Sequence, residues 1–437
     1  MCRPEDPGEG TSIETGGTGP EEALPAAPAR APSFGRALAH RPFFLLWLSQ
    51  LVSQSGDYVF EVALLWLVLQ TTGSVFAVTL VVVATLVPAV LLGPVLGVYV
   101  DRWPRRTILL LTNVAEGVLV AALSGLVLAH EATLPLILGI VFALSVGSQF
   151  VRVTSNALVP QTVSADDLGP ANSLLTFSNS STQIVGLSIG GVVVALFGVN
   201  APIAYDALSF LAAAAIVLFM ASSVGRPEPA AEGDDGRFST QFREGFRYVI
   251  AQRYLLEIIA LGLVVNFAGN TAFALWAPYA DLVLHGGAAT YGLLGAMIAV
   301  GAIVGAIAIG KIDTRRRAGP ILFAGEFAFG GLLIALGLTR SIPLALAESF
   351  GVGVLLSVIN VPLFAAIQAK VPARLMGRVM SVLLALVLAA APFGAFFAGT
   401  LATRTSIEFV YVVGGLLAIG SGVVGVTWMR QIRNLTY

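Results

Sequence analysis

The composition of this 437-residue chain excludes an ordinary soluble fold. Hydrophobic residues make up 57% of it and charged residues 11%, whereas soluble domains have about 45–50% apolar and about 25% charged residues. The net charge is −1, and no basic stripe exists beyond the loops that we assign to the cytoplasm, so no nucleic-acid partner is expected. The single cysteine, Cys2, predicts neither a disulfide framework nor a cysteine metal site. The composition is typical of a protein with many membrane-spanning helices.

Residues 1–40 precede the first long apolar run. They are rich in Pro, Gly, Glu and Ala, and low hydrophobicity with excess charge is typical of disorder. They contain no apolar stretch of the kind found in a cleaved signal peptide. We therefore expect a disordered tail here.

Twelve apolar runs follow the tail, each about as long as the roughly 20 residues that a membrane-spanning helix needs. The predicted spans are 43–70, 75–100, 107–129, 134–158, 171–197, 201–222, 254–281, 289–311, 319–338, 342–369, 375–402 and 407–430. The sequence therefore predicts an all-α membrane protein with twelve transmembrane helices in two pseudo-symmetric six-helix bundles. The bundles are expected over 41–222 and 254–430, followed by a short tail over 431–437.

Positive charge alternates between the two sides of the predicted bundles. The chain has 24 Lys and Arg residues, and all but Arg340 and Arg404 lie in the tails or near every second loop. Because Lys and Arg near helix ends are retained in the cytoplasm, we expect both termini there and the protein in the cell inner membrane. The linker 223–253 is expected on the same side, and its aromatic and arginine pattern from 238 onward predicts an amphipathic helix on the membrane surface.

The two halves of the chain resemble each other. Residues 163–169 (VSADDLG) correspond to 371–377 (VPARLMG), and Asp101 with its neighbouring arginines corresponds to Asp313 with its own. Two repeats of six spans have the same membrane orientation, so their symmetry axis runs along the membrane normal. This is the arrangement of the major facilitator superfamily, in which substrate binds between the halves near the midplane.

A motif between the second and third predicted spans resembles that superfamily closely. Residues 97–106 read GVYVDRWPRR, similar to the signature G-x-x-x-D-R-x-G-R-R, with Pro104 in place of the second glycine. The resemblance implies a conformational latch in which anionic Asp101 engages the positive N-terminal end of the eleventh span and holds the cytoplasmic side closed. Its residues would be Gly97, Asp101, Arg102, Arg105 and Arg106. A simple helix cap by Asp101 is the alternative.

Three further stretches resemble the branch that contains macrolide-efflux proteins and the enterobactin exporter. They are 46–50 with Ser55-Gly56-Asp57, Asp167-Leu168 with Ala171-Asn172-Ser173, and Gly377-Arg378-Val379. The resemblance implies a drug/proton antiporter. Residues 186–191 are similar to the antiporter motif of the fifth span, but Leu187 stands where proline is expected, and this departure weakens the support for antiport.

Five acidic residues inside the predicted spans are candidates for proton coupling or substrate binding, because a membrane-buried carboxylate is costly. Asp57 and Glu61 are four residues apart and share one helix face. Two carboxylates this close in a low dielectric do not both ionise cheaply, so one can carry a proton. Glu348 lies in the tenth span, which lines the cavity by resemblance. Glu116 and Glu326 occupy matching depths in the third and ninth spans, where a structural hydrogen bond to a neighbouring helix is the alternative.

Two polar stripes are candidates for the cavity wall, since their residues recur on one helix face. They are Asn172, Thr176, Asn179 and Gln183 in the fifth span, and Asn266 and Asn270 in the seventh. Hydrogen bonding between helices explains these residues equally well.

Two other charged residues are expected outside the cavity. Asp206, near the outer end of the sixth span, is expected to be a surface or capping residue. Arg152, near the inner end of the fourth span, can extend to the membrane surface. A cavity with acids and no fixed cation favours cationic or neutral amphiphiles over anions, and an Arg152 that faced the cavity would weaken this inference.

The sequence contains no phosphate-binding G-x-x-x-x-G-K-[ST] loop and no HExxH or Cys/His cluster. We therefore expect no enzyme, metal or cofactor, but a monomeric secondary active transporter in the lipid bilayer. Its predicted role is proton-coupled efflux of hydrophobic or cationic small molecules, as in multidrug resistance. A siderophore, nutrient or lipid carrier of the same fold is the first alternative, and a membrane sensor or assembly protein without transport is the second.

Overall fold

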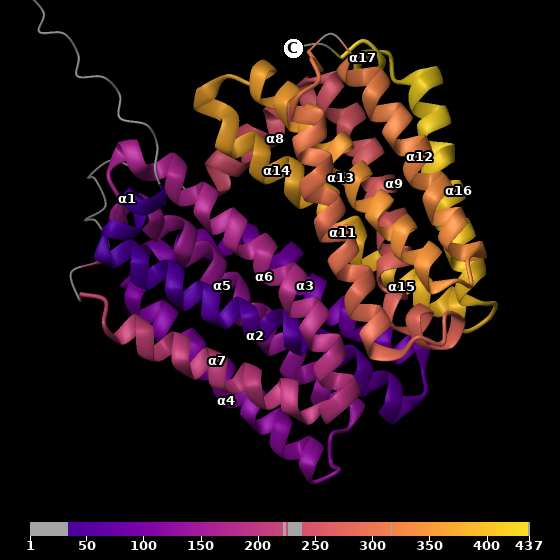
Figure 1. The fold of residues 1–437 in the computed structure, drawn as a ribbon. Coiled ribbons are helices and arrows are strands. Elements are labelled where there is room, and N and C mark those ends of the chain that lie inside the picture. The colour runs from indigo at the N-terminus through magenta and orange to yellow at the C-terminus, as the bar shows by residue number, and fades with distance from the viewer. Residues whose placement is uncertain (1–33, 222–223, 226–237, 316, 436–437) are drawn as a thin grey trace, which may run out of the picture.

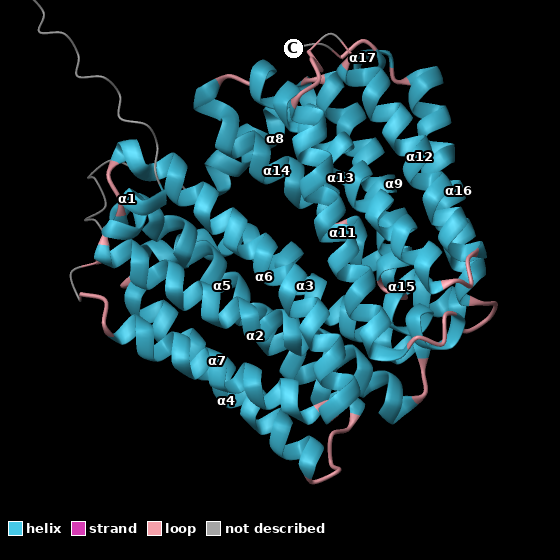
Figure 2. Ribbon diagram, viewed as in Figure 1, coloured by secondary structure: helices cyan, strands magenta, loops and turns pink. Residues whose placement is uncertain are grey.

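The structure is a computed structural model that describes residues 34–221, 224–225, 238–315 and 317–435; the side chains of 93–95, 97–99, 101–102 and 238–241 lie outside it. In this part of the chain every regular element is helical (Figure 2). Within the same residues, twelve helices are long and apolar enough to cross a membrane. The predicted all-α fold with twelve spans is thereby confirmed.

The first six spans begin and end within a few residues of the predicted positions. They are α2 (Arg41–Thr72), α3 (Val75–Arg102), α4 (Arg105–Leu128), α5 (Leu134–Thr162), α6 (Leu168–Phe197) and α7 (Asn200–Leu218). The turn between α2 and α3 follows from two residues. Gly73 ends α2 with a φ of 60°, a conformation that costs glycine nothing, and the Ser74 hydroxyl accepts the Ala77 N–H at the start of α3.

The second six spans include two that are interrupted. They are α9 (Arg253–Phe273) continued by α10 (Trp276–Pro278) and the π-helical turn η2 (Tyr279–Val283), α11 (Gly287–Gly310), α12 (Ala318–Leu338), α13 (Ile342–Lys370), α14 (Met376–Leu388) continued by α15 (Ala390–Ala402), and α16 (Ile407–Trp428). Unbroken apolar runs cover both interruptions in the sequence, so hydrophobicity alone does not reveal them.

Short helices flank the spans on the side of the termini. They are α1 (Phe34–Ala39), α8 (Phe238–Ala251) and α17 (Arg430–Arg433), together with the 3₁₀ turns η1 (Ala165–Asp167) and η3 (Ala373–Leu375). The prediction of disorder throughout 1–40 is wrong for α1, because Arg36 and His40 contact the Asp167 carboxylate at 3.4 and 3.1 Å and hold this helix to the start of α6. Residues 1–33 lie outside the described part of the chain. The predicted amphipathic helix in the linker corresponds to α8.

Each half of the chain packs mainly on itself (Figure 1). In the first half, α7 packs against α2 and α4, and α5 against α3 and α4. In the second half, α11 and α12 both pack against α13, while α16 packs against α9 and α12. The indigo-to-magenta and orange-to-yellow helices of Figure 1 therefore form two bundles.

The closest contacts between the bundles lie away from the termini. We call the side with the start of α2 and the end of α16 the terminal side, and the opposite one the distal side. In the distal halves of α6 and α11, a Cβ added to Gly292 would lie 2.1 Å from the Leu187 carbonyl oxygen. Near the distal ends of α3 and α15, a Cβ added to Gly399 would lie 1.9 Å from Thr79 Oγ1. Glycine at both positions therefore lets the bundles touch.

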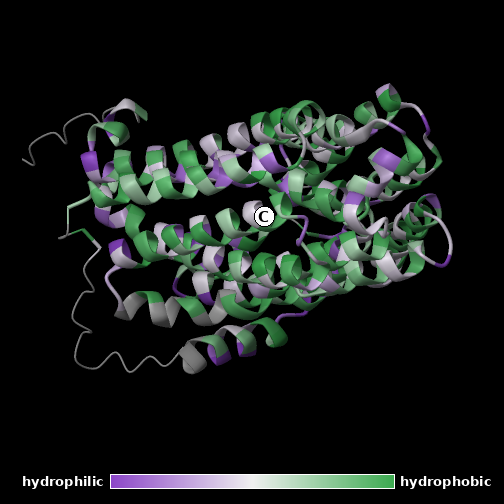
Figure 3. Ribbon diagram, turned by 90° about the horizontal axis from the view of Figure 1, so that it is seen from below, coloured by the Kyte–Doolittle hydropathy of each residue, from purple (hydrophilic) through white to green (hydrophobic). Residues whose placement is uncertain are grey.

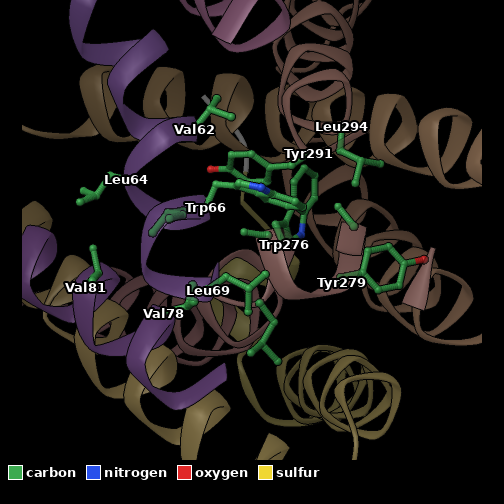
Figure 4. Packing of buried hydrophobic residues seen from close by; sticks show 14 of the residues in the cluster. Val62, Leu64, Trp66, Leu69, Val78, Val81, Trp276, Tyr279, Tyr291 and Leu294 are labelled. Atoms are coloured by element: carbon green, nitrogen blue, oxygen red, sulfur yellow. The ribbon is translucent and has the colours of Figure 1, made fainter. Parts of the chain in front are cut away.

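Large aromatic residues fill this distal junction. Trp66, Trp276 and Tyr279 are buried together with Tyr291 in one hydrophobic cluster (Figure 4). Apolar residues run along most of the helices (Figure 3), and many large ones are exposed, among them Phe197 at 70%. Extensive exposed apolar surface is expected of helices that face lipid.

Candidate functional site

Two adjoining cavities lie inside the first bundle, and the larger one borders the second bundle at Phe273 and Tyr291. Their volumes are about 550 and about 370 Å³, and both are lined by Gln54, Asp57, Glu116 and Asn179. We call them together the acid cavity, because four carboxyl groups line it. These belong to Asp57, Glu61, Glu116 and Asp206.

Asp57 and Glu61 face the acid cavity from one side of α2, as predicted. Asp57 lies at the middle of the helix, and both side chains are exposed to the cavity. The Tyr291 hydroxyl of α11 donates a hydrogen bond to Glu61 Oε1 at 3.3 Å. Glu61 therefore links the acid-bearing helix to the second bundle.

Asp206 is not at the surface, and that prediction is wrong. Its side chain is fully buried in α7, where the Ser209 hydroxyl donates to Oδ1 at 3.2 Å. A Cβ added to Gly56 in α2 would lie 2.3 Å from the same oxygen. Because α2 has no side chain at this position, Asp206 fits directly beside Asp57.

Glu116 occupies a similar glycine-lined space. It is 2% exposed at the middle of α4, and a Cβ added to Gly147 in α5 would lie 2.6 Å from its Oε1. Its Oε2 atom, like Oδ2 of Asp206, is buried and has no hydrogen-bond partner among the described residues. A buried carboxyl oxygen without a donor is costly, so a proton or a cation at either group would lower the free energy of the site.

Arg152 also lines the acid cavity rather than only reaching the membrane surface. Its guanidinium group donates to Gln149 Oε1, at 3.1 Å from Nε. The cavity therefore has one fixed cation near its terminal side, which weakens the predicted exclusion of anions. Four carboxyl groups against one guanidinium still give the cavity a predominantly acidic lining.

A smaller cavity of about 290 Å³ lies inside the second bundle, between α9, α12, α13 and α14. Its polar lining residues are Asn266, Asn270, Glu326 and Asn360, and we call it the amide cavity. Ser421 of α16 donates a hydrogen bond to Glu326 Oε1, which is the contact expected of a structural acid. Asn360 is a single asparagine in an apolar run and belongs to no polar stripe, so the sequence did not predict its place in the cavity.

Phe273 connects the two cavities, since its ring lines both of them. It also packs against Trp276, with 5.5 Å between ring centroids. Trp66, Trp276 and Tyr279 are buried in the hydrophobic cluster of the distal junction and line neither cavity.

The predicted polar stripe of α6 divides between two roles. Asn179 lines the acid cavity and its Oδ1 accepts a hydrogen bond from Tyr58 of α2 at 3.0 Å. Thr176 also lines the cavity, but its hydroxyl donates to the Asn172 carbonyl of its own helix. Gln183 is half-buried in the next turn of α6.

Glu348 and the loop arginines have local partners. Thr339 donates to Glu348 Oε1 at 2.9 Å near the distal end of α13, so this carboxyl group holds the preceding turn. The Arg106 guanidinium donates to the carbonyls of Val217 and Leu218, at 2.8 Å for the second, and caps the end of α7.

The latch remains a prediction for its central residues. The backbone at Gly97, Asp101 and Arg102 belongs to α3, but the side chains of 97, 101 and 102 lie outside the described part. The Arg105 backbone N–H donates to the Gly225 carbonyl at 2.9 Å. In the second-half copy of the motif, Asp313 Oδ1 accepts the Arg315 N–H at 3.2 Å, which is a local turn.

Comparison with known proteins agrees with this architecture. The chain matches the family described as transmembrane secretion effector over residues 33–434. It is 23% identical to the uncharacterized MFS-type transporter YvqJ of Bacillus subtilis, with 88% of this chain and 91% of that protein covered. It is 21% identical to macrolide efflux protein A of Streptococcus pyogenes, with 90% and 97% covered, and 24% identical to the multidrug efflux pump Tap of Mycobacterium tuberculosis, with 90% and 94% covered.

Solved structures share the fold. A bacterial homologue of the iron transporter ferroportin, in an inward-facing state, superposes with a TM-score of 0.71 at 18% identity, covering 89% of this chain and 99% of that one. The nucleoside transporter NupG superposes with a TM-score of 0.70 at 9% identity, covering 89% and 99%. The chain therefore belongs to the transmembrane secretion effector family of the major facilitator superfamily, a family of membrane transporters and not of enzymes.

Proposed function

We propose that this transporter exports a hydrophobic or cationic small molecule in exchange for protons. The observation that carries the proposal is the acid cavity, where Asp57 and Glu61 project from the middle of α2 and Glu61 contacts Tyr291 of the other bundle. A carboxyl group at such a junction can hold either a proton or a cationic substrate. Exchange of one for the other then couples the two fluxes.

The buried acids extend this coupling site. Asp206 and Glu116 line the same cavity as Asp57, and each has a buried oxygen that lacks a donor among the described residues. Groups this close titrate together, so protons belong to the cluster and not to one residue. A cationic substrate would stabilise the ionised cluster and release protons.

Charge supports the choice of substrate. The acid cavity has four carboxyl groups and one guanidinium, that of Arg152. An anion would face the carboxyl groups over most of the lining, whereas a cation need only avoid the terminal side near Arg152. The apolar residues of the lining, among them Leu64 and Phe210, would accommodate a hydrophobic body.

The direction of transport rests on orientation and on the relatives. Lys and Arg cluster on the terminal side, which we assign to the cytoplasm. The bundles contact each other closely on the distal side, so this conformation would take substrate from the cytoplasm. Two relatives are named for macrolide efflux and multidrug efflux, and we propose the same outward direction here.

Proton release tests the proposal directly. Everted vesicles with a pH-sensitive dye, challenged with lipophilic cations and macrolides, would first identify a substrate. That substrate should then release protons from the purified protein in detergent. The double variant Asp57→Asn, Glu61→Gln should strongly reduce this release, because two of the four carboxyl groups of the cluster are then lost.

Glu408→Gln is the matched control. It removes a carboxylate that pairs with Arg340 on the distal surface, at 3.0 Å, away from the acid cavity. It should release protons like the unaltered protein. If the double variant also releases protons normally, coupling does not depend on the α2 pair, and this proposal is wrong.

A further inference from the structure

The polar lining of the amide cavity is rich in hydrogen-bond acceptors. Asn266 and Asn270 donate from Nδ2 to the carbonyls of Gly262 and Asn266, at 3.0 and 2.9 Å. Asn360 donates likewise to the Leu356 carbonyl at 2.8 Å. Because a carbonyl oxygen only accepts, these contacts determine which end of each amide faces its own helix. The oxygen is the end turned away from the backbone, and each Oδ1 remains available as an acceptor beside the second, unused Nδ2 hydrogen.

Glu326 adds a fourth acceptor. Its carboxyl group is 1% exposed, and while Ser421 donates to Oε1, Oε2 is buried with no partner among the described residues. A carboxyl group retains acceptor capacity whether or not it is protonated. Within the described lining of this cavity, no side chain carries a hydroxyl, ammonium, guanidinium, imidazole or indole group.

The rest of the lining is apolar and shaped to admit a ligand. The cavity follows the α9 face formed by Ile258, Gly262, Asn266 and Asn270, spaced by one helical turn. Leucine, isoleucine, valine and phenylalanine side chains from α12, α13 and α14 close the other sides. Its volume of about 290 Å³ is near the lower limit of about 300–1,000 Å³ for small-molecule sites. The site fits a compact apolar group that bears hydrogen-bond donors.

We propose that the amide cavity is a binding subsite that selects ligands by their N–H donors. It accepts protonated amines on an apolar skeleton and rejects quaternary ammonium ions of the same charge. A quaternary ion presents methyl groups to the oxygens of Asn266, Asn270, Asn360 and Glu326, and a buried acceptor left without a donor costs about 1–3 kcal/mol. Charge alone, which the acid cavity supplies, would not make this distinction.

The subsite would act together with the acid cavity. Phe273 lines both, so a ligand in the amide cavity lies one aromatic ring away from the acid cavity. The first bundle then carries the exchangeable protons and the second recognises the amine. This division of roles between the bundles rests on the proposed function. The subsite can still be tested separately, because ligand binding is measured without a proton gradient.

A matched pair of probes tests the subsite. Phenylbutylamine and its N-trimethyl analogue have the same charge and skeleton at neutral pH but differ in N–H donors. The full-length protein in nanodiscs of phosphatidylcholine should bind the amine about tenfold or more tightly than the trimethyl compound by calorimetry. Asn270→Leu and Asn360→Leu should each weaken amine binding about fivefold, and neither should weaken binding of the trimethyl compound, because each removes an acceptor that this compound leaves without a donor.

Ser357→Ala is the control variant. Ser357 lies one turn before Asn360 in α13, but its hydroxyl donates to the Ala302 carbonyl of α11 at 2.7 Å. This variant should bind both probes like the unaltered protein. Equal affinity of the unaltered protein for the two probes would overturn the subsite without reference to any variant.

The two proposals fail separately. If amine selectivity is absent while Asp57→Asn, Glu61→Gln still strongly reduces proton release, the subsite is wrong and proton-coupled export stands. If the double variant releases protons normally while Asn360→Leu weakens amine binding, proton coupling through the α2 pair is wrong and the subsite stands.

Discussion

Glycine residues opposite the buried acids explain how this bundle holds carboxyl groups at its centre. Gly56 faces Asp206 and Ser209, and Gly147 faces Glu116. In each case the neighbouring helix contributes only backbone, so a carboxyl group occupies the volume of a missing side chain. The Ser55-Gly56-Asp57 stretch that resembles efflux proteins therefore combines an acid with the space for a second one.

Gly56→Ala should destabilise the protein more than a comparable change elsewhere. The new Cβ would lie 2.1 Å from Ser209 Oγ and 2.3 Å from Asp206 Oδ1, and overpacking of this kind costs about 1–3 kcal/mol. Thermal unfolding in detergent measures the effect. Gly139→Ala in α5 is the control, because no heavy atom lies within 4 Å of its Cβ position and alanine favours helix. Equal melting temperatures for the two variants would contradict this account.

At the scale of elements, the short helices on the terminal side are attached by different interactions. Asp167 binds α1 through Arg36 and His40. Glu257 Oε2 accepts the backbone N–H groups of Gln431 and Ile432 at 3.0 and 3.1 Å and so caps the first turn of α17. The role of Glu257 could not be predicted from the sequence, since its partner is a helix far along the chain.

The attachment of α8 to α14 should depend on packing more than on charge. The Glu244–Arg378 ion pair is 52% and 36% exposed, and such surface pairs contribute about 0–1 kcal/mol. In contrast, a Cβ on Gly245 would lie 2.7 Å from the Arg378 carbonyl oxygen. A backbone atom cannot move aside as the end of a flexible side chain can. Gly245→Ala should therefore raise hydrogen exchange across α8 by about tenfold, whereas Glu244→Gln should change it little. A larger effect of Glu244→Gln would show that charge governs the attachment.

At the scale of the whole molecule, two bundles meet on the distal side through α6–α11 and α3–α15. Small residues permit both contacts, as expected for membrane helices that pack without a hydrophobic driving force. Leu187, which replaces the proline of the antiporter motif, lies at the first contact and packs against Gly292 and Gly295. The departure from the motif therefore falls where the bundles must separate during alternating access.

The orientation of the molecule is testable with single cysteines in a Cys2→Ser background. Lys311 follows α11 on the terminal side, and Arg340 follows α12 on the distal side; both are exposed. An impermeant maleimide should label Arg340→Cys in intact cells and Lys311→Cys only after permeabilisation, because positive loops are retained in the cytoplasm. The opposite labelling pattern would reverse the topology and the proposed direction of transport.

The sequence by itself determines much of this protein. Apolar runs long enough for a membrane predict the twelve spans, and the spacing of Asp57 and Glu61 predicts their common face, because both depend on local geometry along one helix. The charge alternation likewise requires no knowledge of packing. Motif resemblance predicts the family that the comparison confirms.

Only the tertiary structure decided which polar groups share a cavity. Asp206 and Asn360 are single polar residues in apolar helices, and nothing near them in sequence distinguishes a surface cap from a buried acid or a cavity acceptor. Arg152 was expected to reach the membrane surface, but the packing of α5 beside α2 and α4 leaves it in the acid cavity. Such outcomes depend on how helices distant in sequence pack together, and on where a glycine such as Gly56 lets them approach. Local periodicity does not contain that information.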